Sequence, residues 1–100
     1  MREMNICDYM KSRSESDILV DIRDRRMFEF GTVSGAVNIP VEDIGELYRL
    51  PKESNIYLFC QAGEISGEIA ELLSDAGYNV CNLTGGYREY LRQQMSEQTE

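Results

Sequence analysis

The chain of 100 residues contains no histidine and no tryptophan. The missing imidazole removes the usual general base of cysteine and serine hydrolases, and also the commonest metal ligand in proteins. The three cysteines, Cys7, Cys60 and Cys81, lie far apart in the sequence, which is not the spacing of a metal site. We therefore expect no metal, no cofactor and no disulfide framework, but three reduced thiols.

Long apolar runs and an excess of positive charge are missing as well. No stretch approaches the roughly 20 apolar residues of a membrane-spanning helix, and residues 1–8 have no apolar segment long enough for a signal peptide. The 18 acidic and 10 basic residues give a formal net charge of −8, which disfavours nucleic acid and anionic membranes as partners. We expect a cytoplasmic protein that binds neither.

The length favours one domain, residues 1–100, with one compact core. The hydrophobic fraction of 42% is ordinary for a globular protein. The polar end, about residues 94–100, is expected to fray. We find no internal repeat, low-complexity block or linker that would divide the chain.

Apolar periodicity predicts strands that alternate with helices. The short apolar runs 17–22 and 56–59 are typical of buried parallel strands, and the segment before Pro40 predicts a brief strand. A helical face begins at residue 65 and should end at Gly77, before an extended segment over 78–83. The residues of this expected face are Ile65, Ile69, Leu72, Leu73 and Ala76. Further helices are expected over 25–30 and 41–50, and from about Gly85 with Thr84 as its cap.

Cys60 closes the predicted strand and directly precedes a glycine-containing loop and a helix start. This order places its thiol at the carboxyl end of a parallel strand, where backbone N–H groups and the positive end of a helix dipole converge. We therefore interpret Cys60 as a thiolate nucleophile. A single cysteine is more often a small buried hydrophobic residue, and we keep that interpretation for Cys81, within a strand, and for Cys7, near an N-terminal helix start.

Several polar residues near this loop allow two interpretations. Glu68 suits the first turn of the helix, because a carboxylate there favours the helix dipole. Together with Glu64 it would instead form an acidic rim that selects a basic protein partner or a neutral persulfide donor. The Ser66 hydroxyl is predicted to cap the helix, with donation to a bound sulfur as the alternative.

A small basic cluster lies at the start of the helix predicted over 25–30. Arg23, Arg25 and Arg26 lie close together, with Asp21 and Asp24 as their acidic neighbours. We interpret the three arginines as the solvated face of a first helical turn.

Four segments, in this order and at these separations, resemble single-domain rhodaneses. They are Asp-Ile-Arg at 21–23, Gly-Ala-Val-Asn-Ile-Pro at 35–40, Tyr-Leu-Phe-Cys-Gln-Ala-Gly at 57–63 and Asn-Leu-Thr-Gly-Gly-Tyr at 82–87. The resemblance implies a three-layer α/β fold, with about five parallel strands and helices on both faces of the sheet. It also implies a sulfurtransferase in which catalytic Cys60 accepts a sulfane sulfur as a persulfide and passes it to a thiol, cyanide or protein acceptor.

The chemistry of such a transfer requires a thiolate and a set of N–H donors around the transferred sulfur, and it requires no general base. The residues expected to bind the sulfur are Gln61, Ala62, Gly63, Glu64, Ile65 and Ser66. Gly63 would allow the loop to curl tightly around it.

This sequence differs from the rhodanese pattern within the loop. Many active rhodaneses carry an arginine late in the loop, where this chain has Ile65, and Glu64 adds a negative charge. We expect Glu64 to raise the pKa of Cys60 and to repel dianionic donors, so that thiosulfate is a poor donor. Thr32 stands where the family often has histidine, which is usually not the catalytic group.

Two other classes of function are considered. The chain could be a catalytically inactive rhodanese-like module that binds or regulates a protein, and Glu64 and Ile65 favour that alternative. A cysteine phosphatase or arsenate reductase of the related fold would need a longer loop with a cysteine, five residues and then an arginine. This chain has Ser66 in the position of that arginine, so this class is disfavoured.

Overall fold

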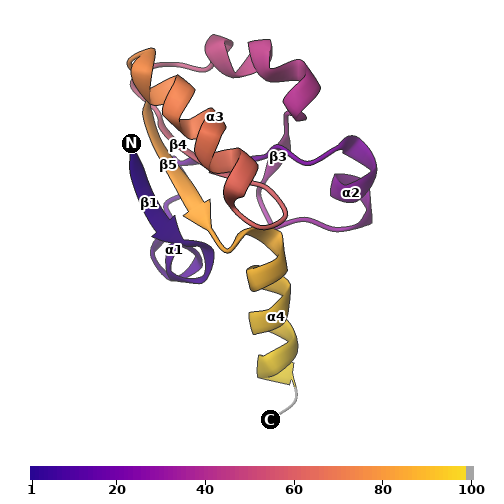
Figure 1. Cartoon of the computed structure of the whole chain (residues 1–100). Coiled ribbons are helices and arrows are strands. Elements are labelled where there is room, and N and C mark those ends of the chain that lie inside the picture. Colours follow the sequence, from indigo (N-terminus) through magenta and orange to yellow (C-terminus); the bar gives the residue numbers. More distant parts are fainter. Residues whose placement is uncertain (99–100) are drawn as a thin grey trace.

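The computed structural model describes the backbone of residues 1–98 and the side chains of residues 1–97. Five parallel strands form one sheet in the order β1-β5-β4-β2-β3, as the resemblance implied (Figure 1). The strands are β1 (Arg2–Asn5), β2 (Ile18–Asp21), β3 (Val37–Asn38), β4 (Asn55–Phe59) and β5 (Asn79–Thr84). The central strand β4 lies between β5 and β2, so its carboxyl end opens at the middle of the sheet.

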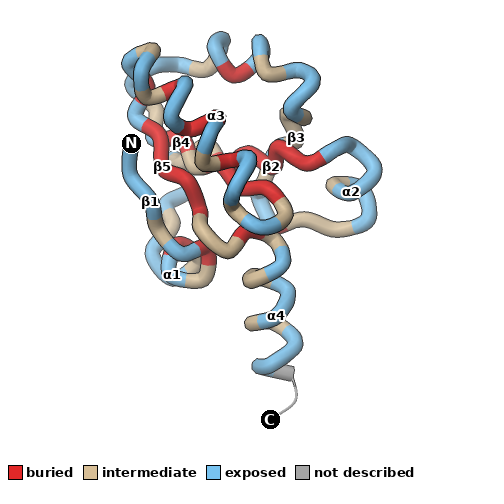
Figure 2. The backbone as a smooth tube through the Cα atoms, viewed as in Figure 1, coloured by how far each residue is buried: buried red, intermediate tan, exposed pale blue. Residues whose placement is uncertain are grey.

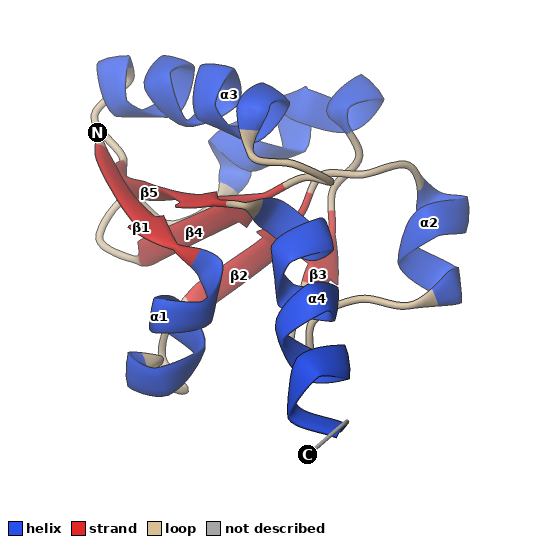
Figure 3. Ribbon diagram, turned by 60° about the horizontal axis from the view of Figure 1, so that its bottom comes forward, coloured by secondary structure: helices blue, strands red, loops and turns tan. Residues whose placement is uncertain are grey.

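Helices cover both faces of this sheet (Figure 3). They are α1 (Ile6–Ser12), α2 (Arg25–Phe30), α3 (Glu64–Asp75) and α4 (Gly86–Gln98), with a 3₁₀ segment over Val41–Arg49. The helix α3 and the 3₁₀ segment cover one face, α1 and α4 cover the other, and α2 projects at the side beyond β3. No helix of the described residues is both long and apolar enough to cross a membrane.

Two apolar clusters, one on each face of the sheet, make up the core. On the α3 face, Leu58 and Val80 of the strands pack with Ile69 and Leu73, all nearly inaccessible to solvent. On the α1 face, the cluster includes Tyr9 and the strand residues Phe59 and Leu83. Figure 2 shows this burial in β2, β4, β5 and the inner side of α3, whereas most of α4 beyond its first turn is exposed or half-buried. The sheet thus fixes the end of β4 from both sides.

The strand β1 was not predicted from the sequence. It has four residues, of which only Met4 is half-buried, and it pairs with one neighbour, β5. Its end does provide the expected helix start near Cys7, because the Asn5 side chain accepts a hydrogen bond from the Cys7 N–H at 2.8 Å. A short polar edge strand of this kind carries no apolar alternation to detect.

Two of the predicted helices differ from the expectation. The predicted helix over 41–50 is a 3₁₀ segment with a non-helical break at Asp43 (φ −106°, ψ 28°). On α3, Ile69 and Leu73 are buried, but Ile65 and Leu72 are each 52% exposed, so the buried face is narrower than predicted. Gly77 ends α3 with φ +93°, as expected of a C-terminal cap.

The C-terminal helix begins and ends differently from the prediction. Thr84 ends β5 and is not a helix cap, and α4 begins at Gly86. The helix continues to Gln98, so residues 94–98 of the segment expected to fray are helical, and residues 99 and 100 lie outside the described part.

Candidate active site

Cys60 follows β4 directly and is 6% exposed. Residues 61–63 then lead into α3, so the thiol lies at the carboxyl end of the central strand and before a helix N-terminus, as predicted. The N-terminus of α4 holds the same loop from the other side. The N–H of Tyr87 donates to the Cys60 carbonyl at 2.9 Å, and the N–H of Arg88 donates to the Gln61 carbonyl at 3.0 Å.

Three donors converge on the Cys60 sulfur. The N–H of Gly63 lies 3.1 Å from Sγ, the N–H of Ser66 lies 3.4 Å away, and the Ser66 hydroxyl lies 3.3 Å away. Gly63 is the N-cap of α3 with φ +95°, and it makes no side-chain cap hydrogen bond. The sulfur therefore accepts the helix N–H groups that a capping side chain would otherwise satisfy.

These donors determine the acidity of the thiol. Burial raises the pKa of Cys60, but hydrogen bonds from the Ser66 hydroxyl and from the N–H groups of Ser66, Ala62 and Gly63 outweigh it, so the pKa lies below the ordinary 9.0. Glu64 is not among these main causes, so the predicted increase in the pKa is not found. The structure favours a thiolate at this position.

The other two cysteines show the opposite effect. Burial is the main cause that raises the pKa of both Cys7 and Cys81. Cys81 is 1% exposed within β5, and Cys7 is half-buried on α1. Among the three thiols, only that of Cys60 has a lowered pKa.

Ser66 does not cap the helix, which corrects the first of its two interpretations. It is the third residue of α3 and is fully buried. Its hydroxyl lies between Sγ and the Asn82 side chain. The Ser66 Oγ lies 2.6 Å from the Asn82 Oδ1. Asn82 was not predicted as a site residue, although an amide within an otherwise apolar strand is a signal that could have indicated it.

A sharp turn at Gly85 and Gly86 brings α4 under the loop. Both residues have positive φ, +84° and +60°. A Cβ atom at Gly86 would lie 2.7 Å from the Gln61 carbonyl oxygen, so only glycine allows this close approach.

A hollow of about 810 Å³ lies over Cys60. Its lining includes apolar Met27, Val41 and Ile65, and acidic Asp24, Glu42 and Glu64. The cations of the lining are Arg23 and Arg88. Several residues of the lining are exposed, and Ile65 is exposed by half, so the hollow can admit a molecule of some size to the sulfur.

The remaining predicted binding residues are arranged in two sets. Gln61, Ala62, Glu64 and Ile65 line the hollow, whereas Gly63 and Ser66 contact Sγ. Glu64 begins α3, in place of the loop position predicted for it. Glu68 is exposed and does not line the hollow.

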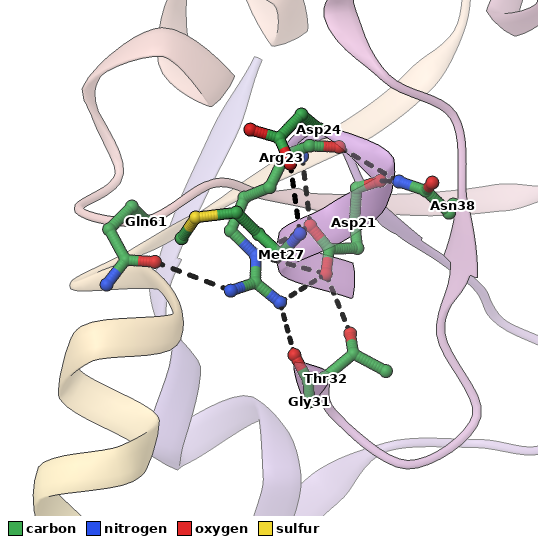
Figure 4. Close-up of polar contacts among 8 residues, drawn as sticks. All are labelled: Asp21, Arg23, Asp24, Met27, Gly31, Thr32, Asn38 and Gln61. Carbon is green, nitrogen blue, oxygen red and sulfur yellow. Dashed lines mark hydrogen bonds and ion pairs between the residues drawn. The ribbon is translucent and has the colours of Figure 1, made fainter. Parts of the chain in front are cut away.

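Arg23 is buried and is not part of a solvated cluster. Figure 4 shows its polar contacts. Its guanidinium pairs with the fully buried Asp21 carboxylate at 2.7 Å and donates to the Gly31 carbonyl at 2.6 Å. It also donates to the Gln61 Oε1 at 3.4 Å, while the Thr32 hydroxyl donates to Asp21 at 2.8 Å. Arg25 and Arg26 are exposed on α2, as predicted, so only Arg23 needs a different account.

The Arg23 guanidinium also lies 4.0 Å from the centre of the Tyr87 ring. Arg23 therefore joins β2, the segment after α2, the Cys60 loop and α4. Over the described part of the chain, no group of three cysteine or acidic side chains could hold a metal ion.

Comparisons with known proteins identify the family of this chain. Residues 7–93 match the family described as Rhodanese-like domain. The chain is 32% identical over 96 residues to the adenylyltransferase and sulfurtransferase UBA4 of Meyerozyma guilliermondii, covering 85% of this chain but only 22% of that enzyme. It is 30% identical over 73 residues to the thiosulfate sulfurtransferase PspE of Escherichia coli, covering 70% of each chain.

The fold has similar solved structures. A rhodanese-related protein from Thermoplasma volcanium superposes with a TM-score of 0.84 and 23% identity, covering 93% of each chain. At that identity the likeness concerns the fold alone. Because the family match extends over most of the sequence, this chain belongs to the rhodanese-like domain family.

Proposed function

We propose that this protein is a sulfurtransferase that accepts a sulfane sulfur on Cys60 as a persulfide. One observation carries the proposal: a thiol with a lowered pKa lies at the end of β4, with three hydrogen-bond donors directed at its sulfur. The named relatives UBA4 and PspE, both sulfurtransferases, support the reaction class.

The transfer proceeds in two displacements. The Cys60 thiolate attacks the outer sulfur of a persulfide donor, the donor's sulfur–sulfur bond breaks, and the donor leaves as a thiolate. A thiol, cyanide or a protein cysteine then attacks the terminal sulfur on Cys60, and the Cys60 thiolate is released. Each step forms one bond to sulfur and breaks one, so no external oxidant or reductant is needed.

The donors around Sγ act on both states of the site. They stabilise the thiolate before the first displacement and again as the leaving group of the second. Because all three are neutral, they can also accommodate the terminal sulfur without forming an ion pair that must break.

Charges around the hollow define which donors are favoured. Asp24, Glu42 and Glu64 line it, while the buried Arg23 is paired with Asp21, so Arg88 is the one cation of the lining without an ion pair among the residues that the structure describes. Dianionic thiosulfate should therefore be a poor donor, and a neutral persulfide or a basic protein partner should be favoured. The three free thiols fit a reducing compartment, which we take to be the cytoplasm.

Intact mass after incubation of the reduced protein with cysteamine persulfide, in which an ammonium group balances the persulfide anion, tests the proposal. Wild-type protein should gain one sulfur, cyanide or a thiol should remove it, and Cys60→Ser should gain none on that residue. Peptide mapping places the sulfur, with Cys7 and Cys81 as internal controls because their pKa values are raised. A folded wild-type protein that never gains sulfur on Cys60 would overturn the proposal.

That negative outcome would favour the alternative, a catalytically inactive rhodanese-like module that binds or regulates a protein. Glu64 and Ile65 support this alternative, because both line the hollow where the family often provides positive charge. Sulfur uptake by Cys60 distinguishes the two functions, because a binding module would retain the fold without a reactive thiolate.

A further inference from the structure

We propose that Asn82, on β5, is a positioning residue that holds Gly63 and Ser66 against the Cys60 sulfur. The site described above contains the donors but not what fixes them in place. The consequence for sulfur transfer depends on the proposed function, whereas the effect on the thiol can be measured without it.

One amide contacts both ends of the donor set. The Asn82 Nδ2 donates to the Gly63 carbonyl at 3.1 Å, and its Oδ1 lies 2.6 Å from the Ser66 Oγ. Gly63 and Ser66 supply the three donors that lie within 3.4 Å of Sγ, and the Ala62 N–H of the same loop also lowers the pKa of Cys60. Asn82 is 1% exposed, so solvent does not compete for these contacts in the folded protein.

The orientation of this amide is determined by its partners. A second hydrogen bond runs from Nδ2 to the Glu3 Oε2 at 3.2 Å, and Glu3 lies beside Asn82 in the register of β1 and β5. Two acceptors therefore fix the amide nitrogen, which leaves Oδ1 facing Ser66 as an acceptor. The edge strand β1 thereby contributes to the site without contacting Cys60.

The helix α3 is shaped for the same contact. Gly67 lies next to Ser66, and a Cβ atom there would come within 3.2 Å of the Asn82 Nδ2. Glycine inside a helix is less favourable than alanine. Its presence at residue 67 allows the amide to approach the helix closely.

The Ser66 hydroxyl has one proton and two neighbours that can receive it. Asn82 Oδ1 is closer than Sγ, 2.6 Å against 3.3 Å, so the amide holds the hydroxyl oxygen at its place beside the sulfur. Two effects of removing Asn82 then oppose each other. Without Asn82, Gly63 and Ser66 would no longer be held in place, which would withdraw their donors from Sγ. The Ser66 hydroxyl would also lose its competing acceptor, which would free its proton for Sγ. We expect the loss of positioning to be the larger effect.

The test is the pH profile of Cys60 alkylation by iodoacetamide, followed by peptide mass. Asn82→Ala should move the profile to higher pH and slow alkylation at neutral pH roughly threefold to tenfold, the range for one or two lost hydrogen bonds. A profile that stays in place or moves to lower pH would overturn the proposal. Cys81→Ala is the matched control, because it lies on the same strand and packs in the cluster on the α1 face.

A second variant remains informative even if Asn82→Ala does not fold. Gly67→Ala favours the helix but pushes the Asn82 amide away from its partners. We expect an equal or higher free energy of unfolding together with a smaller shift of the profile in the same direction. An unchanged pH profile in a stable Gly67→Ala protein would overturn the positioning role of Asn82. Failure of sulfur loading in wild type would instead overturn the proposed function and leave these shifts intact.

Discussion

Two buried polar networks meet at the Cys60 loop, and they differ in the charge of their side chains. One is ionic: Asp21 and Arg23 pair at 2.7 Å on the side of β2. The other is neutral: Ser66 and Asn82, with Gly63, surround the sulfur on the side of α3 and β5. Fixed charges are thus kept for joining elements, and neutral dipoles are used at the reacting atom.

This difference explains how the loop can stabilise an anion although Glu64 begins the next helix. The guanidinium of Arg23 reaches Gln61, the first residue after Cys60, but its charge is already matched by Asp21. The sulfur is stabilised by N–H and O–H groups, whose effect is local. An approaching donor therefore meets the acidic residues of the lining, Asp24, Glu42 and Glu64, and not a cationic loop.

The largest expected effect comes from the ionic network. Arg23→Met leaves the fully buried Asp21 carboxylate without its cation, which should lower the free energy of unfolding by about 3–5 kcal/mol. Urea unfolding followed by circular dichroism measures this loss. Arg25→Met is the matched control, since the exposed Arg25 pairs with Glu29 at 3.8 Å and should contribute less than about 1 kcal/mol. Equal effects of the two variants would contradict the comparison.

A smaller effect is expected when a charge is introduced on the neutral side. Ile65→Arg places a free cation in the wall of the hollow, where no buried carboxylate neutralises it. It should raise kcat/KM for thiosulfate roughly tenfold, equivalent to about 1.4 kcal/mol, by attracting the dianion. The gain should shrink as salt is added.

Ile65→Gln is the control for this gain, because it changes size and polarity without adding charge. If Ile65→Gln raises thiosulfate use as much as Ile65→Arg, electrostatic exclusion is the wrong explanation. Cyanide as acceptor in both assays keeps the second displacement the same.

The sequence was sufficient for the parts of the fold that depend on local pattern. Apolar runs located β2, β4 and β5, and Gly77 marked the end of α3. The strand β1 could not be found this way, because its pairing with β5 and not its composition makes it a strand. Cys60 at the end of β4 followed from chain order alone.

The surroundings of Cys60 were harder to predict, for a physical reason. Ser66 was interpreted as a cap because a helix N-terminus usually needs one, but here the sulfur itself accepts the helix N–H groups. Arg23 is interpreted as solvated because charge on a helical face is commonly exposed, whereas its contacts with Gly31 and Gln61 form only in the folded chain. Asn82 likewise acquires its role only when β5 packs beside α3.

The smallest effect concerns the dependence of stability on pH, and it isolates the neutral network. The folded-state pKa of Cys60 lies below 9.0, so between that pKa and 9.0 the unfolded state binds more protons. Wild type should therefore gain stability relative to Cys60→Ser as pH rises through this interval, and the difference should level off above 9.0. Burial raises the pKa of Cys7 and Cys81, which has the opposite sign, but both thiols are present in the two proteins, so their contributions cancel in the difference. Urea unfolding at several pH values measures the difference. A difference that falls with rising pH would mean that burial outweighs the donors around the sulfur, and the contrast between the two networks would then fail at the atom it was meant to explain.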